Sequence, residues 1–212
     1  MKHSPIYGPE DFVRDTGVSR ETLENLRIYA ETLVKWNKKV NLVSRSTIDG
    51  LWHRHFLDSA QLYPLFPPNS QVLIDLGSGA GFPGLVLAIM GCPQVHMVEA
   101  DRRKSEFLRE VVRLTAAPAQ IHNSRIEALE PFPVDIVTAR ALAPLPDLLS
   151  WAEPFMAPKS QCLFLKGRNV EDELTETHNI WETELIRRAS RTDQESTVLC
   201  IREVRRVRSD QA

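Results

Sequence analysis

The segment DLGSGAGFPG, residues 75–84, constrains the fold of this chain more than any other part of the sequence. It begins inside the apolar run 72–76 and leads into a second apolar run that ends at Met90. Glycine permits a tight turn between strand and helix, and it lets the backbone approach a ligand where a Cβ would collide. Gly79, Gly81 and Gly84 also have the G-x-G-x-x-G spacing of nucleotide-binding folds. The segment therefore predicts a ligand-binding loop at the carboxyl end of a parallel strand.

Apolar strands and helices alternate after this loop. Strands are predicted at 72–76, 95–99, 120–122, 135–139, 161–166 and 197–204, and helices at 83–90, from 101 onward and at 146–155. Asp101 is a suitable N-cap for the second of these helices. Alternation of this kind predicts an α/β fold, a doubly wound and mostly parallel sheet with helices on both faces.

The first third of the chain has a helical pattern instead. Ser19 is a suitable N-cap for a helix from Arg20, and a second helical stretch is predicted at 48–62. The proline-rich segment 63–70 then ends the helical pattern. We expect a helical N-terminal extension, residues 1–66, packed on a ligand-binding domain of residues 67–212.

Composition narrows the class of protein. No apolar run is long enough to cross a bilayer, and the first residues lack the apolar stretch of a signal peptide. The three cysteines, Cys92, Cys162 and Cys200, are far apart and have apolar neighbours, which favours buried thiols over disulfides or zinc. We expect a cytoplasmic protein without a membrane-bound part.

The net charge of −2 neither requires nor excludes a nucleic-acid partner. Arginine is concentrated near the end of the chain, at Arg187, Arg188, Arg191, Arg202, Arg205, Arg206 and Arg208. These residues either contact phosphates or form the solvated face of a late strand and its tail. Trp36, Lys38 and Lys39 also suit RNA contacts, although Trp36 can equally be a core residue.

Two acidic residues, Asp75 and Glu99, are expected near the ligand of the glycine loop, and Asp75 distinguishes between the possible ligands. Asp75 precedes the loop, where its charge opposes a pyrophosphate but suits the cationic methionine end of S-adenosylmethionine. Glu99 ends the second predicted strand, where a carboxylate can accept hydrogen bonds from ribose hydroxyls of either cofactor. The residues favour S-adenosylmethionine, and an NAD-dependent oxidoreductase stays as the alternative.

Five further segments and the loop together resemble one family, the bacterial 16S ribosomal RNA guanine-N7 methyltransferases, also called glucose-inhibited division protein B. The segments are WNKKVNL at 36–42, HFLDS at 55–59, DLGSGAGFPG at 75–84, RIE at 125–127, TARA at 138–141 and LKG at 165–167. The resemblance covers roughly residues 25–170. It implies a class I S-adenosylmethionine-dependent methyltransferase whose substrate is 16S ribosomal RNA or a small-subunit particle, with S-adenosylhomocysteine as the product.

The resemblance also implies roles for individual residues. The expected cofactor-binding residues are Gly77, Gly79, Gly81, Phe82, Glu99, Ile126, Glu127 and Arg140. Ile126 and Glu127 should border the adenine, and Arg140 should lie beside the methyl group as the catalytic residue. The alternatives are a surface ion pair between Arg125 and Glu127, and a simple salt bridge for Arg140.

The chemistry of the implied reaction agrees with the short inventory of reactive residues. Guanine N7 carries a free lone pair, so it can attack the methyl group without a general base, and catalysis is mainly alignment. No cysteine is placed to attack a pyrimidine, and ARAL at 139–142 replaces the Asn/Asp-Pro-Pro-aromatic motif of amine methylation. His53 and His55 face apart on a helix, which argues against a metal, whereas His55 and Asp58 share a face and can hold the N-terminal segment over the cleft.

Three other functions stay open at this point. They are the oxidoreductase, a non-catalytic RNA-binding protein with a vestigial cofactor pocket, and a methyltransferase of small molecules. An oxidoreductase should carry a catalytic Tyr/Lys or His/acid pair downstream of the loop, and none is apparent. We expect no metal and no obligate protein partner.

Overall fold

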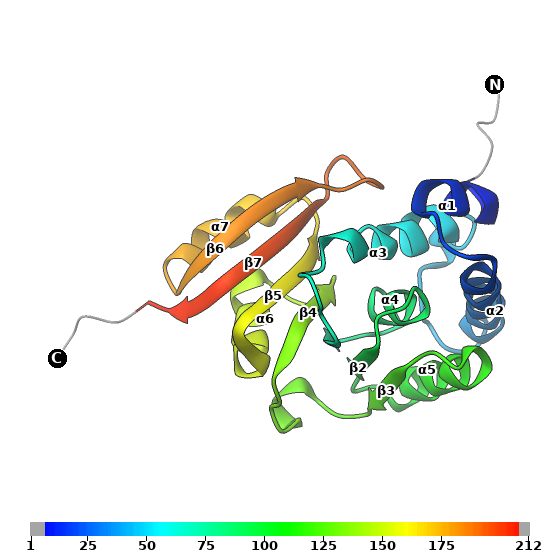
Figure 1. Ribbon diagram of the computed structural model, residues 1–212, viewed down its shortest axis with the longest axis horizontal. Helices are drawn as coiled ribbons and strands as arrows, with labels where there is room; N and C mark the ends of the chain where they lie inside the picture. The colour runs from blue at the N-terminus through cyan, green and yellow to red at the C-terminus, as the bar shows by residue number, and fades with distance from the viewer. Residues whose placement is uncertain (1–6, 208–212) are drawn as a thin grey trace.

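A seven-stranded sheet forms the centre of the molecule in a computed structural model that describes residues 7–207 (Figure 1). The strands are β1 (Val72–Leu76), β2 (Gln94–Val98), β3 (Ala119–His122), β4 (Val134–Arg140), β5 (Met156–Lys166), β6 (Trp181–Ala189) and β7 (Thr197–Arg206). Their order is β3-β2-β1-β4-β5-β7-β6. Neighbouring strands from β3 to β5 are parallel, and β7 is antiparallel to both β5 and β6. The predicted doubly wound, mostly parallel sheet is confirmed.

Helices cover both faces of this sheet (Figure 1). One face packs against α1 (Pro9–Thr16), α2 (Arg20–Asn37), a π-helix (Trp52–Leu57), α3 (Asp58–Ala60), α4 (Gly84–Ile89) and α5 (Arg102–Thr115). The other face packs against α6 (Leu145–Ala152) and α7 (Val170–His178). Short 3-10 helices lie at Arg45–Thr47, Tyr63–Leu65, Ile126–Ala128 and Glu153–Phe155. The π-helix and α3 occupy the stretch predicted as helical at 48–62.

Strand residues alternate between the two hydrophobic cores. Leu73 belongs to the core beneath α4, whereas Ile74, the next residue, belongs to the core beneath α6. Successive side chains of a strand point to opposite faces, so a strand covered on both sides needs apolar residues at consecutive positions. This requirement explains why the central strands appear as short continuous apolar runs in the sequence.

The N-terminal helices share their core with the sheet. Ser19 accepts a hydrogen bond from the Thr22 backbone N–H at 3.0 Å, which confirms the predicted cap of α2. Tyr29 of α2 is fully buried, and its ring stacks on Phe82 at a centroid distance of 5.4 Å. Phe12 of α1 belongs to the same core. The first helices therefore pack beneath the glycine loop and help to hold it in place.

Two elements, α7 and β6, are absent from the strands and helices predicted from the sequence. β6 is an edge strand whose residues are mostly exposed, so its apolar pattern is weak. Only Trp181 at its start is fully buried. An edge strand gains its stability from pairing with β7, which a local pattern does not reveal.

The described residues contain no helix long and apolar enough to cross a membrane. Cys92, Cys162 and Cys200 are free and buried, as the sequence predicts. Burial raises the pKa of Cys92 to about 11 and that of Cys162 further, so these thiols stay protonated and serve as packing groups.

Candidate active site

The winding direction of the sheet reverses between β1 and β4, and the glycine loop lies at the carboxyl end of β1 beside this reversal. Gly81 has φ +97°, and a Cβ there would be 2.6 Å from the Tyr29 hydroxyl. Gly84 would place a Cβ 2.7 Å from the Cβ of Asp75. The loop therefore excludes side chains at these two positions because it packs tightly against α2 and β1.

A cavity of about 420 Å³ opens above this loop. Its wall includes the predicted cofactor residues Gly77, Gly79, Phe82, Glu99, Ile126, Glu127 and Arg140. Gly81 is not part of the wall and lies against Tyr29 instead. Most of the wall residues lie at or just after the carboxyl ends of β1, β2, β3 and β4, which is the arrangement expected at the switch point of a doubly wound sheet.

Glu99 gives the cavity a buried carboxylate. Its Oε2 accepts a hydrogen bond from the Gly79 backbone N–H at 2.8 Å, and its Oε1 accepts one from the Asp101 N–H at 2.7 Å. Each carboxylate oxygen has a second lone pair, so Glu99 can still accept hydrogen bonds from ligand hydroxyls. The contact with Gly79 also ties the glycine loop to the end of β2.

Asp75 is placed differently from what its position before the loop suggested. The side chain is fully buried and is not part of the cavity wall. Its Oδ1 accepts a hydrogen bond from the Thr138 hydroxyl at 2.7 Å, while Oδ2 has no hydrogen-bond partner in the described part of the chain. Burial raises the pKa of Asp75 to about 6, against the opposing effect of the hydrogen bond from Thr138. The carboxyl lies under α4 because it shares a strand face with Leu73.

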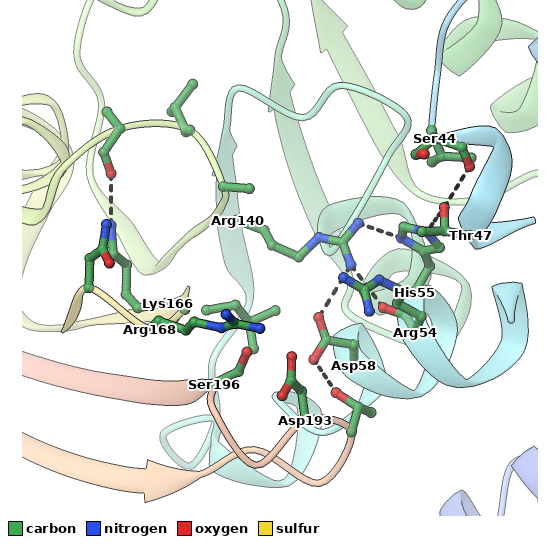
Figure 2. Close-up of a pocket in the computed structure, with 18 of the residues that line it drawn as sticks. Ser44, Thr47, Arg54, His55, Asp58, Arg140, Lys166, Arg168, Asp193 and Ser196 are labelled. Carbon is green, nitrogen blue, oxygen red and sulfur yellow. Dashed lines mark hydrogen bonds and ion pairs between the residues drawn. The ribbon is translucent and has the colours of Figure 1, made fainter.

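A second cavity, of about 870 Å³, adjoins the first. The two share a wall made of Leu42, Val43, Arg140, Ala141 and Leu142. Figure 2 shows the larger cavity, with cationic side chains from two separate segments, Arg54 from one and Lys166 and Arg168 from the other, around it. Concave sites with apolar walls and a few polar groups are typical of ligand binding.

Arg140 lies between the two cavities at the end of β4 (Figure 2). Its Nη1 donates to Asp58 Oδ2 at 3.2 Å and to the Arg54 carbonyl oxygen at 3.3 Å, and its Nη2 donates to His55 Nδ1 at 2.8 Å. The guanidinium carbon is 5.0 Å from the centroid of the Phe82 ring, within cation–π range. Arg140 thus forms a salt bridge and also borders the cavity, so the two interpretations of this residue are compatible.

His55 and Asp58 both face Arg140, as their spacing in the sequence predicts, and hold the N-terminal segment at the cleft. His53 packs its ring edge-on against Tyr7, with the ring centroids 5.1 Å apart, and also borders the larger cavity. Burial and the nearby cations Arg140 and Arg54 lower the pKa of His55 to about 3. In the described residues, no three His, Cys, Asp or Glu side chains are arranged to hold a metal ion.

Asn37 and Lys166 matter for the site, although no role for either residue was predicted from the sequence. The Asn37 side chain bonds to the backbone of Leu42 and Val43, with distances of 2.8 to 3.1 Å, and so places both residues in the shared wall. Lys166 donates to the Ala143 carbonyl oxygen at 2.8 Å and pairs with Glu173 at 2.5 Å. Both residues belong to segments that resemble the family, and that resemblance was the available signal.

Other candidate residues have simpler surroundings. Trp36 packs against Phe107 at a centroid distance of 5.8 Å, which supports its core interpretation. Arg125 and Glu127 line the smaller cavity and do not form an ion pair with each other in the described structure. The surface ion pair considered for them is therefore not seen.

The late arginines mostly have protein partners. Arg187 pairs with Glu171, Arg202 donates to Gln161, Arg205 pairs with Glu203, and Arg206 donates to Ser150 and lies over the Trp181 ring. Arg208 lies outside the described residues. The cations that border the cavities, such as Arg54 and Lys104, come from other parts of the chain.

Solved structures of similar fold are distant in sequence. A putative O-methyltransferase from Klebsiella pneumoniae matches with a TM-score of 0.59 over 91% of this chain and 94% of its own, at 12% identity. M. jannaschii TYW2 in complex with AdoMet matches with a TM-score of 0.55 over 80% of each chain, at 14% identity. These likenesses show a shared fold.

Sequence relatives are much closer. The proteins named ribosomal RNA small subunit methyltransferase G from Paramagnetospirillum magneticum and Rhodospirillum rubrum are 55% and 54% identical to this chain. The alignments cover 95% and 93% of this chain and 98% of each relative. Nothing in these matches supports an NAD-dependent oxidoreductase. Since the family model for rRNA small subunit methyltransferase G also matches residues 22–199, the chain belongs to that family.

Proposed function

We propose that this protein transfers a methyl group from S-adenosylmethionine to N7 of a guanosine in 16S ribosomal RNA. The observation that carries the proposal is the pair of adjoining cavities at the switch point, which share a wall containing Arg140. One cavity can hold the methyl donor and the other the base, with the reacting atoms meeting at the common wall. Family membership supports ribosomal RNA as the substrate.

The residues of the smaller cavity fit S-adenosylmethionine. A cradle of glycines, in which a Cβ at Gly77 would collide with Leu142, leaves room for the methionine end. Glu99 can accept hydrogen bonds from the ribose hydroxyls, and Ile126 and Glu127 can border the adenine. When bound, the cofactor supplies an electrophilic methyl group on a sulfonium. Gly81 contributes to this site through the shape of the loop.

The protein's part in the reaction is alignment. Guanine N7 has a free lone pair, so no side chain has to remove a proton. His55 is unsuited to act as a base because both of its ring nitrogens are already hydrogen-bonded. We propose Arg140 as the catalytic residue. Its charge is balanced by Asp58, so it can donate hydrogen bonds to guanine O6 without placing an unpaired cation beside a ring that becomes positive.

The cations around the cavities suit an RNA backbone. Arg54 and Arg168 border the larger cavity, and Lys104 and Arg125 border the smaller one. Phosphate contacts from such side chains would hold the RNA while the base enters the larger cavity. We propose a cytoplasmic protein that acts on 16S RNA or a small-subunit particle, with residues 1–66 as a helical extension of the methyltransferase domain 67–212.

The decisive experiment compares N7-methylguanine in ribosomal RNA from cells with and without this gene. We expect one N7-methylguanine of 16S RNA to disappear without the gene and to return with the wild-type gene. The Gly79→Asp variant should fold, should not bind S-adenosylmethionine in calorimetry and should not restore the modification, because a charged side chain would enter the cavity. An unchanged methylation map would refute the proposed substrate. Undiminished cofactor affinity in folded Gly79→Asp would refute the proposed cofactor site.

A further inference from the structure

Arg140 is the first member of a hydrogen-bond chain that follows one wall of the larger cavity (Figure 2). Its Nη2 lies 2.8 Å from His55 Nδ1, and His55 Nε2 lies 3.0 Å from the Thr47 hydroxyl. Thr47 in turn donates to the backbone carbonyl oxygen of Ser44 at 2.8 Å. The chain ends on a backbone atom of the 3-10 turn that precedes the π-helix.

The direction of every bond in this chain follows from its first member. Arginine only donates hydrogen bonds, so His55 Nδ1 must be the acceptor and must carry no proton. The proton of the neutral ring is then on Nε2, which donates to Thr47, and the Thr47 hydroxyl donates onward to Ser44. His55 is buried, and the low pKa that results from this burial and the adjacent cations keeps its ring neutral.

The contacts of Arg140 leave part of its guanidinium available. The Nη1 group donates to Asp58 and to the Arg54 carbonyl oxygen, and one Nη2–H donates to His55. The Nε–H makes no hydrogen bond within residues 7–207. A planar group held at one edge and stacked on Phe82 presents its other N–H groups in a fixed direction.

We propose that His55 is a positioning residue for methyl transfer, whose Nδ1 holds the guanidinium of Arg140 so that its free N–H groups face the reacting base. This inference rests on the proposed function for the identity of the base. His55 borders the larger cavity, but in this scheme it acts on the base through Arg140. The hydrogen bond from Arg140 to His55 restricts rotation of the guanidinium before the reaction begins. This rotational entropy therefore does not have to be lost in the transition state.

A matched pair of variants separates this role from packing. Both His55→Asn and His55→Gln lose the ring that stacks on Phe82 at 5.0 Å. Only asparagine retains an acceptor at the second atom beyond Cβ, where His55 Nδ1 is found. Glutamine extends one atom further, toward Thr47. We therefore expect similar decreases in melting temperature for the two variants but different rates of methyl transfer.

The first measurement is the single-turnover rate of methyl transfer to small-subunit particles that lack the modification, at saturating S-adenosylmethionine. His55→Asn should retain most of the wild-type rate. His55→Gln should lose about 10- to 100-fold, the range seen when a residue that orients a functional side chain is removed. The affinity for S-adenosylmethionine should stay near the wild-type value in both. Equal rates in the two variants would overturn the proposal.

The second measurement does not depend on activity. Nitrogen-15 NMR of the Arg140 side chain, assigned by its loss in Arg140→Lys, reports rotation about the guanidinium bonds. We expect slow rotation with separate Nη–H signals in the wild type and His55→Asn, and averaged signals in His55→Gln. Averaged signals in the wild type would overturn the inference. If the wild-type protein failed to produce N7-methylguanine while the slow rotation persisted, the proposed function would fail and the positioning of Arg140 would stand.

Discussion

Gly84→Ala should destabilise the protein because α4 lies too close to β1 for any added side chain. A Cβ at Gly84 would be 2.7 Å from the Cβ of Asp75, whereas apolar carbons normally approach to about 3.5–4.0 Å. The conflict is with a strand atom and with a fully buried side chain, so neither partner can move aside cheaply. The helix would have to shift by about 1 Å.

The magnitude follows from two opposing effects. Overpacking of a core costs about 1–3 kcal/mol, and two immobile partners put this site near the upper value. Alanine has a better helix propensity than glycine, which offsets up to about 1 kcal/mol of this loss of stability. We therefore expect a net loss of about 2 kcal/mol, which lowers the melting temperature of a chain of this size by about 4–8 °C.

The assay is thermal and urea unfolding followed by circular dichroism. Gly50→Ala is the matched control, since a Cβ there would meet only the Thr47 carbonyl oxygen at 3.9 Å, and its stability should change by no more than about 0.5 kcal/mol. If Gly84→Ala were as stable as Gly50→Ala, the argument that this glycine is required for close helix–strand packing would be wrong.

Three further predictions concern charge. Burial raises the pKa of Asp75 from 3.8 to about 6, so the folded state binds more protons than the unfolded state between these values. The free energy of unfolding of the wild type should therefore fall as pH rises through this window, as measured by urea unfolding at several pH values. Asp75→Asn should lose this pH dependence, and its free energy of unfolding at pH 7 should be higher by up to about 3 kcal/mol. The single-turnover rate should be nearly constant through neutral pH, and a tenfold rise per pH unit would instead indicate a general base. In salt titrations of RNA affinity, Arg54→Gln should lower the slope of log affinity against log salt concentration by about 1, because Arg54 borders the larger cavity. Arg205→Gln should leave this slope unchanged, because Arg205 pairs with Glu203. Equal slopes in both variants would contradict this difference.

Local spacing along the chain was sufficient to predict the parallel strands of the sheet and the glycine loop. Residues 72–84 combine a strand, a glycine turn and the start of a helix within a few residues of one another, so their conformations depend mainly on neighbours in sequence. The caps Ser19 and Asp101 were predictable for the same reason. Glu99 was predictable as a cavity residue because it follows a strand whose carboxyl end must meet that of β1.

The environment of Asp75 was within reach of the sequence but was interpreted incorrectly. Its position before the loop suggested a side chain facing the cofactor. The two-residue period of a strand places it on the same face as Leu73, beneath α4, where it accepts a hydrogen bond from Thr138. Position along the chain was informative here, but the direction of the side chain decided its role.

The sequence by itself determined the parallel strands of the sheet, the glycine loop and the family, because these depend on periodicity and on short motifs. Only the tertiary structure decided the surroundings of Arg140, since its partner Asp58 is separated from it by 82 residues. Asp58 also accepts a hydrogen bond from Thr192, in the loop between β6 and β7. The tertiary structure likewise decided that β7 pairs between β5 and β6. Side-chain partners and strand order depend on which distant segments pack together, and this is settled by the burial of the whole chain.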